Sequence, residues 1–230
     1  FAVNPLAINV PFLRSSTTEF TGYGISNPTP EPATIVAFAT DQDGQTIAGT
    51  NNPAISVLDP YEQISFIGEQ FFGLEEGSHL GWIQILSNSD WTRSFFLNSA
   101  TSSEYMDGTL ADAWLYGDFH IPSVAEDYFQ GVSTIQTELF FVNPNPVSVT
   151  LQLRLRDAAG TVVGSLDQAI APGAMLSGTI RDLFFRDSTV VDIASGYLTG
   201  SSTTLFGVAG FAMTRYFDPT GAVKTIRSLP

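Results

Sequence analysis

Two stretches of the chain repeat one pattern, and this repeat decides the fold that we expect. Residues 141–160 read FVNPNPVSVTLQLRLRDAAG, and residues 25–44 read ISNPTPEPATIVAFATDQDG. Each stretch contains an Asn-Pro pair, continues as an extended segment and ends in an Asp-containing turn. Asn27 and Asn143 are 116 residues apart, and the two turn aspartates have the same separation. Self-similarity at a fixed spacing indicates two copies of one structural unit.

The second stretch alternates between aliphatic and polar residues. Its apolar positions are Val147, Val149, Leu151, Leu153 and Leu155. A period of two is typical of a strand with one buried and one wet face. Short segments of this kind recur, separated by turn residues, as in β-sandwiches and barrels. We therefore predict an all-β chain of two tandem antiparallel β-sandwich modules, immunoglobulin-like or jelly-roll-like, spanning residues 1–112 and 113–230.

One short segment in each copy departs from the strand pattern. Residues 66–72 read FIGEQFF and residues 179–185 read TIRDLFF, so that Ile67 and Phe71 match Ile180 and Phe184. Apolar residues spaced i and i+4 lie on one face of a helix. We expect one or two helical turns at this point of each copy.

The composition excludes several classes of function. The 230 residues carry a formal net charge of −14, and the chain has a single lysine. Binding to nucleic acid needs clustered basic side chains, and so does binding to an anionic membrane surface. This chain has too few basic residues for either. No apolar run approaches the roughly 18 residues of a membrane span, so membrane insertion is not expected. The chain has no cysteine, which excludes disulfides and thiolate metal sites. Because it begins at Phe1 rather than Met, we expect a processed protein or an excised fragment.

The two copies differ on one strand face. Val36 and Phe38 of the first copy stand where the second has Gln152 and Arg154. We predict that this apolar face is covered, by the second copy or by another subunit. The alternative is that the surface tolerates a few exposed apolar residues.

The apolar beginning of the chain supplies a second set of interface candidates. These candidates are Phe1, Val3, Leu6 and Ile8. They would suit subunit contacts, including strand addition at a sheet edge. The alternative is that this segment completes its own sandwich, because residues 6–13 have an equivalent inside the second copy.

The residues that usually carry catalysis are sparse. His79 and His120 are the only histidines, and no HExxH or GxSxG motif occurs. We predict no catalytic residue and no cofactor. The adjacent acids Glu75-Glu76 and Glu126-Asp127 are interpreted as solvated loop residues, since adjacency does not place two carboxylates across a sugar.

Asp41 and Asp43 form a weak candidate for calcium. The sequence DQDG resembles the opening of a calcium loop but lacks a downstream acidic ligand. The second copy reads DAAG from Asp157, so it keeps the turn and loses the second carboxylate. This comparison favours a hairpin turn.

Exposed aromatic side chains raise the possibility of sugar binding. Trp82, Trp91 and Tyr197 are the candidates, because aromatic faces stack on sugar rings. Packing in the core or at an interface is the alternative for each. The Asn-Pro pairs are interpreted as strand-entry punctuation and edge protection, because proline denies its nitrogen to a ladder.

Several of these motifs together resemble a known kind of module. The chain has TIQTELFFVNP at 134–144, then a DxxG turn, APG at 171–173 and RDLF at 181–184. This pattern is similar to tandem modules of secreted bacterial proteins, often near the C-terminal ends of large surface chains. The resemblance implies an extracellular β-sandwich without an assigned activity.

These observations lead to three functional hypotheses. The first is a non-enzymatic structural or adhesive protein, secreted or on the cell surface, such as a subunit of a filament or layer. Its partners would be proteins, through self-association or contact with other surface proteins. The second is a carbohydrate-binding module with a polysaccharide partner. The third is a hydrolase with an unrecognised site that would depend on His79 and His120.

Overall fold

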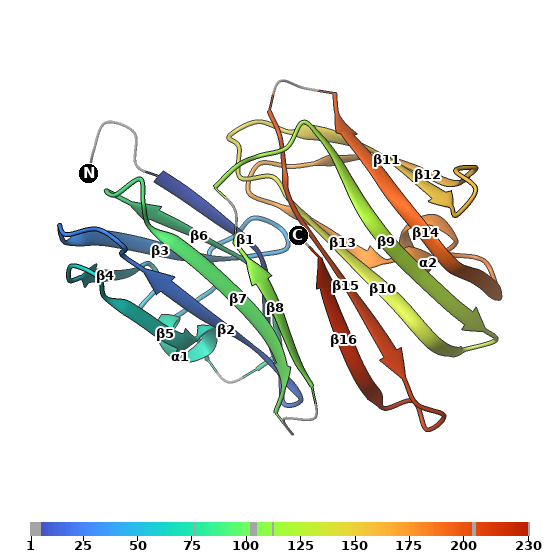
Figure 1. The fold of residues 1–230 in the computed structure, drawn as a ribbon, viewed down its shortest axis with the longest axis horizontal. Coiled ribbons are helices and arrows are strands. Elements are labelled where there is room, and N and C mark those ends of the chain that lie inside the picture. Colours follow the sequence, from blue (N-terminus) through green and yellow to red (C-terminus); the bar gives the residue numbers. More distant parts are fainter. Residues whose placement is uncertain (1–5, 76, 102–104, 112, 204–205, 230) are drawn as a thin grey trace. The chain divides into compact units, whose positions relative to one another are not determined.

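The protein is built almost entirely of strands (Figure 1). The computed structural model describes residues 6–75, 77–101, 105–111, 113–203 and 206–229. Within these ranges lie sixteen strands and two short helices, and the strands form two separate antiparallel sheets of eight. The predicted all-β class with two sandwich modules is confirmed. No helix in the described ranges is long and apolar enough to cross a membrane.

The first sheet contains strands β1 to β8. Their order is β4-β3-β6-β1-β2-β7-β8, and β5 pairs with β2. The bounds are β1 Leu6–Ser15, β2 Glu19–Ser26, β3 Ala33–Asp41, β4 Ala54–Leu58, β5 Gln63–Ile67, α1 Gly68–Phe72, β6 His79–Ser87, β7 Arg93–Ala100 and β8 Met106–Leu110.

The core of the first sandwich includes aromatic side chains of β1, β2 and β7. The ring of Phe12 on β1 lies 6.3 Å from that of Phe96 on β7, measured between centroids. The hydroxyl of Tyr23 on β2 donates a hydrogen bond to the Phe12 carbonyl at 2.9 Å. All three side chains are at most 2% exposed. Burial of such aromatic side chains dominates the stability of the sandwich.

The second sheet repeats the first strand by strand. Its order is β12-β11-β14-β9-β10-β15-β16, and β13 pairs with β10. The bounds are β9 Asp118–Phe129, β10 Val132–Val142, β11 Val149–Asp157, β12 Val162–Ile170, β13 Met175–Thr179, α2 Ile180–Phe184, β14 Val190–Ser202, β15 Ala209–Phe217 and β16 Val223–Leu229.

The pairing register is repeated as well. Asp41 pairs with Gly81 in the first sheet, and Asp157 pairs with Gly196 in the second. The chain divides into two compact units, 1–114 with 173–175 and 115–172 with 176–230. The boundary that we predicted falls beside residue 112, which lies outside the described residues.

Strand β11 shows the alternation that the sequence predicts. Val149, Leu151, Leu153 and Leu155 are all 0% exposed, and the residues between them are half-buried. The strand begins at Val149, however, and Val147 precedes it with 42% of its surface exposed. Alternation alone therefore placed the start of the strand too early.

A buried asparagine anchors the same loop in both units. The Nδ2 of Asn27 donates to the carbonyls of Glu31, Leu58 and Asp59 at 2.7, 3.4 and 3.0 Å. Asn143 is used in the same way in the second unit, where it is also 0% exposed. Its Nδ2 donates to the carbonyls of the three equivalent residues, Val147, Ile170 and Ala171, at 2.8, 2.9 and 3.1 Å. The asparagine, and not only its proline, therefore has a structural function.

The helices correct one detail of the sequence comparison. α1 begins at Gly68 and α2 at Ile180, 112 residues later, and both have five residues. Gly68 is thus equivalent to Ile180, one residue away from the predicted match of Ile67 with Ile180. The repeated aromatic pairs misled the alignment, whereas the strand that precedes each helix fixes the register.

The two units fill this part of the core differently. A Cβ on Gly68 would lie 2.8 Å from Cε2 of Tyr23, so no larger side chain fits there. In the second unit Leu139 takes the position of Tyr23, and the 0% exposed Ile180 takes that of Gly68. Volume lost at one position is restored at the other, as close packing requires.

Glycine is required in the DxxG turns, and this yields a first prediction. Gly160 has φ of +86°, a region that side chains rarely adopt. We expect Gly160→Ala to lower the free energy of unfolding of the second unit by about 1 kcal/mol. Urea denaturation measures the change. Gly117→Ala is the control, because a Cβ on Gly117 meets nothing within 4 Å; equal losses in both variants would contradict the argument.

Candidate functional site

The calcium candidate is a turn in the structure. Oδ1 of Asp41 accepts hydrogen bonds from the backbone N–H groups of Asp43 and Gln45 at 3.0 and 2.8 Å. Asp157 makes the equivalent bonds to Ala159 and Thr161, both at 2.9 Å. This carboxylate closes the hairpin in each unit, as the turn interpretation expects. In the described part of the chain, no three His, Cys, Asp or Glu side chains gather as metal ligands would.

The two histidines lie in different units and different surroundings. Nε2 of His79 lies 2.9 Å from the carbonyl oxygen of Glu75. His120 is exposed on β9, with its ring 5.1 Å from that of Tyr197 in an edge-on arrangement. The structure therefore does not bring these residues together within either unit.

Of the three sugar-stacking candidates, one has a free face. Trp82 is only 4% exposed, and a sugar ring cannot stack on a buried indole. Tyr197 is half-buried beside His120. Trp91 is 62% exposed, and the guanidinium of Arg93 lies 5.9 Å from its ring centroid.

The interface candidates divide into three groups. Val36 is 8% exposed and Phe38 is half-buried, so the face that they share is not open. Ile8 is 2% exposed and pairs with Ile85 of β6, so it belongs to the core of its own sandwich. Leu6 begins the same strand and is half-buried. Phe1 and Val3 lie outside the described residues.

Glu126 is the most unusual titratable group that we find, and the expectation that it is a solvated loop acid is wrong. It lies within β9 and is 0% exposed. Its Oε2 accepts a hydrogen bond from the N–H of Thr137 at 3.4 Å, and its Oε1 has no partner among the described residues. Burial raises the pKa of Glu126 to about 8, and the charges of Asp182 and Asp127 also raise it. The Thr137 hydrogen bond and the charge of Arg181 act in the opposite direction.

The first unit shows what Glu126 replaces. Ser15 occupies the equivalent place on β1 and donates a hydrogen bond to Oε2 of Glu69 on α1 at 2.6 Å. In the second unit the acid stands on the strand, and Arg181 stands at the helix position of Glu69. The exchange moves the carboxyl from the helix to the buried strand, and the guanidinium of Arg181 pairs with Asp182 at 3.5 Å. We interpret Glu126 as part of the second unit's interior rather than as a reactive group, because none of the grooves described around it includes it.

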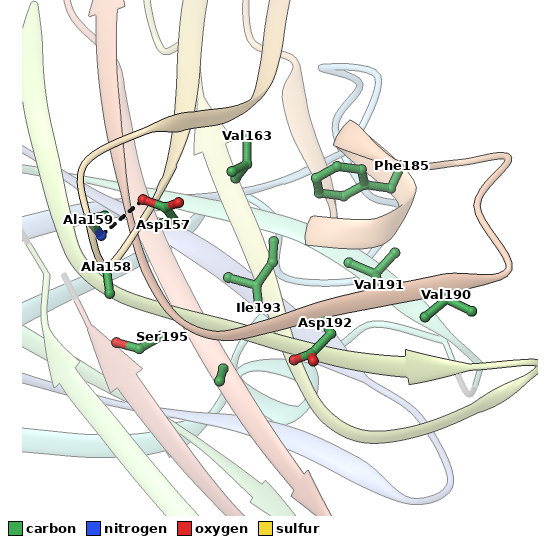
Figure 2. Close-up of a pocket in the computed structure, with 11 residues that line it drawn as sticks. Asp157, Ala158, Ala159, Val163, Phe185, Val190, Val191, Asp192, Ile193 and Ser195 are labelled. Carbon is green, nitrogen blue, oxygen red and sulfur yellow. Dashed lines mark hydrogen bonds between the residues drawn. The ribbon is translucent and has the colours of Figure 1, made fainter.

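A groove of about 620 Å³ opens on the second unit (Figure 2). Val163 of β12, Ile193 of β14 and Phe185 at the end of α2 point toward one another across it. Asp157 and Asp192 lie at its rim, and the turn residues Ala158 and Ala159 close one side. The sequence gives no signal for this groove, because its walls come from segments that are far apart along the chain.

The groove is an apolar surface with few polar groups, and it holds no set of residues that would activate a nucleophile or bind a metal. It contains no histidine, lysine or arginine. Such a surface suits the packing of apolar side chains rather than a chemical reaction.

Comparisons with known proteins add little to this description. No protein-family model matches the sequence, and no curated protein matches it. One solved structure found by shape is a β-glucuronidase from glycoside hydrolase family 2, with 8% sequence identity and a TM-score of 0.19. That alignment covers 96% of this chain and 23% of the other. A likeness this weak supports no conclusion about either fold or activity.

Proposed function

We propose that the chain is a non-enzymatic structural or adhesive protein that associates with other copies of itself outside the cell. The observation that carries the proposal is the apolar character of two edge strands. On β4, Ile55 and Val57 are 68% and 59% exposed, and on β8, Met106 and Leu110 are 63% and 72% exposed. Edge strands with exposed apolar side chains are sites where other strands add.

The use of the repeated motifs supports the same proposal. The anchoring asparagines and the DxxG turns hold loops and turns in place in both units, as the hydrogen bonds of Asn143 and Asp157 illustrate. The extracellular location rests on the resemblance of these motifs to modules of secreted bacterial proteins. Surface filaments and layers are the assemblies that such a subunit would form.

Self-association is the test of this proposal. We expect sedimentation velocity to show larger species as the protein concentration rises, and electron microscopy to show filaments or layers. Because the contacts proposed are apolar, high salt should not dissolve them. A chain that stays monomeric at high concentration in both measurements would exclude the proposal.

Trp91 supports carbohydrate binding as a second candidate function. Its indole is 62% exposed, and the neighbouring Arg93 could hydrogen-bond sugar hydroxyls while the ring stacks. We expect Trp91→Ala to weaken retention in affinity electrophoresis with soluble polysaccharides by about tenfold, given the typical worth of an aromatic contact. Trp91→Phe keeps an aromatic face and should retain part of the affinity. Absence of retention for the unmodified chain on every polysaccharide would remove this candidate.

A further inference from the structure

A loop of the first unit covers the end of its helix. The connection from β3 to β4 spans residues 42–53, and part of it lies against the end of α1. The N–H groups of Thr50 and Asn51 donate to the carbonyls of Gly73 and Phe72, both at 3.0 Å, and Gly49 forms a bridge with Leu74. Beneath this loop Phe72 is 0% exposed. In the first unit, an extended backbone segment therefore covers the end of α1 and the buried Phe72 beneath it.

The second unit lacks this cover. The connection from β11 to β12 is residues 158–161, and the groove of Figure 2 lies beside it. Phe185 holds the position of Gly73 and lines the groove, half-buried. A Cβ on Gly73 would lie 2.1 Å from Oγ1 of Thr50, so a side chain at this position and the covering loop exclude each other. The second unit has therefore exchanged an internal cover for a half-buried aromatic side chain that lines the groove.

One wall of the groove is an unpaired strand edge. β14 pairs with β9 from Val190 to Ile193, but its pairing with β11 ends where Gly196 meets Asp157. In the described part of the chain, residues 190–195 therefore have no partner on the side of the groove. Free backbone groups beside an apolar wall are what strand addition requires.

We propose that this groove binds strand β4 of a second copy of the chain. β4 has one unpaired edge, and it presents Ile55 and Val57 on its exposed face. It carries no charge from Ala54 to Leu58, which matters beside the acidic rim of Asp157 and Asp192. The other edge strands fit less well: β8 carries Asp107, β12 carries Asp167, and β16 presents charged side chains, all of which would be desolvated in an apolar groove.

This contact would join different surfaces of two copies. β4 belongs to the first unit and the groove to the second, so each copy has one donor and one acceptor. Such a heterologous contact builds an open chain of subunits unless the rotation closes a ring. The inference rests on the proposed function and assigns its contact surfaces.

Matched substitutions test the two surfaces. Val163→Glu places a charge in the groove at a side chain that is 39% exposed, and Val162→Glu makes the same change on the same strand outside the groove, at 42% exposure. Ile55→Glu changes β4, and Val132→Glu on β10, at 63% exposure, is its control away from both the groove and the edge strands. We expect Val163→Glu and Ile55→Glu to raise the concentration needed for self-association at least tenfold, and both controls to leave it unchanged. Circular dichroism and thermal unfolding confirm that each variant is folded.

Mixing the two variants that cannot self-associate, Ile55→Glu and Val163→Glu, gives the decisive result. Ile55→Glu retains a functional groove and Val163→Glu retains a functional β4, so their mixture should form dimers and nothing larger. Self-association that survives both substitutions would overturn this contact while leaving the proposed function standing. A native chain that never associates would overturn the proposed function as well. Dimers of either variant alone would show that another surface is used and would also overturn the inference.

Discussion

Asn143→Ala is expected to destabilise the second unit by about 4 kcal/mol, because each buried polar group left without a partner costs about 1–3 kcal/mol. The side chain is 0% exposed and its Nδ2 serves three carbonyls. Its Oδ1 also accepts the N–H of Asn145 at 3.1 Å. Removing the amide leaves the Ile170 carbonyl and the polar groups of Asn145 without their buried partner, and the part-buried carbonyls of Val147 and Ala171 lose a donor. Hydrogen exchange followed by unit, or urea unfolding, measures the loss.

The first unit supplies a replicate of this experiment, and the surface supplies a control. Asn27→Ala should cost a similar amount, but in residues of the first unit, because its amide makes the equivalent three bonds. Asn88→Ala removes an exposed acceptor of the Thr34 N–H and should cost less than about 1 kcal/mol. If both buried variants lose no more than the Asn88 variant, the asparagine is not the anchor of the loop.

Glu126→Gln is expected to abolish a pH dependence of stability in the second unit. The pKa of Glu126 is raised from 4.5 to about 8 in the folded protein, chiefly by burial. The folded state therefore holds a proton that the unfolded chain releases near pH 4.5. The contribution of Glu126 to the free energy of unfolding is fully present below pH 4.5 and is lost as the pH rises to 8. Because one pKa unit corresponds to about 1.4 kcal/mol, the loss is about 5 kcal/mol.

The comparison of stability at several pH values isolates this group. Unfolding by urea between pH 5 and pH 8.5 should show a falling free energy for the native chain and a much flatter profile for Glu126→Gln, which cannot ionise. Glu138→Gln is a suitable control, since that carboxylate is paired with Arg215. A native profile that is flat, or that rises with pH across this window, would contradict the burial of a protonated carboxyl.

The fold could be predicted from the sequence because each copy uses the same local chemistry. An alternating strand, a DxxG turn and an Asn-Pro pair act over a few residues, so their pattern survives in one dimension. The position of Val36 and Phe38 was predicted in the same way, and the structure places them on a face that is not open. What covers that face stays a prediction.

The features that escaped prediction depend on contacts between distant segments. Glu126 looks like an exposed acid next to Asp127. Its burial follows the extra residue that β9 has between Ile121 and Val124, opposite Leu198 and Gly196, which turns Val124 and Glu126 inward. The groove forms where α2, β12 and β14 meet. Nothing in the sequence shows that the shorter connection of the second unit leaves this surface uncovered. Hydrophobic periodicity reports which face of one element is buried, but not which element lies against it.

The exchange at the start of the two helices constrains the history of this duplication. The first unit combines Tyr23 with Gly68, and the second combines Leu139 with Ile180. A tyrosine together with an isoleucine would clash, because a Cβ at Gly68 would already lie 2.8 Å from Tyr23. If the ancestral module carried the tyrosine, its replacement by leucine had to come first, passing through an intermediate with a small void. If it carried the leucine, the shrinkage to glycine had to precede the tyrosine. Either order passes through leucine with glycine, because a module with tyrosine and isoleucine together would have to shift the tyrosine ring or the start of the helix.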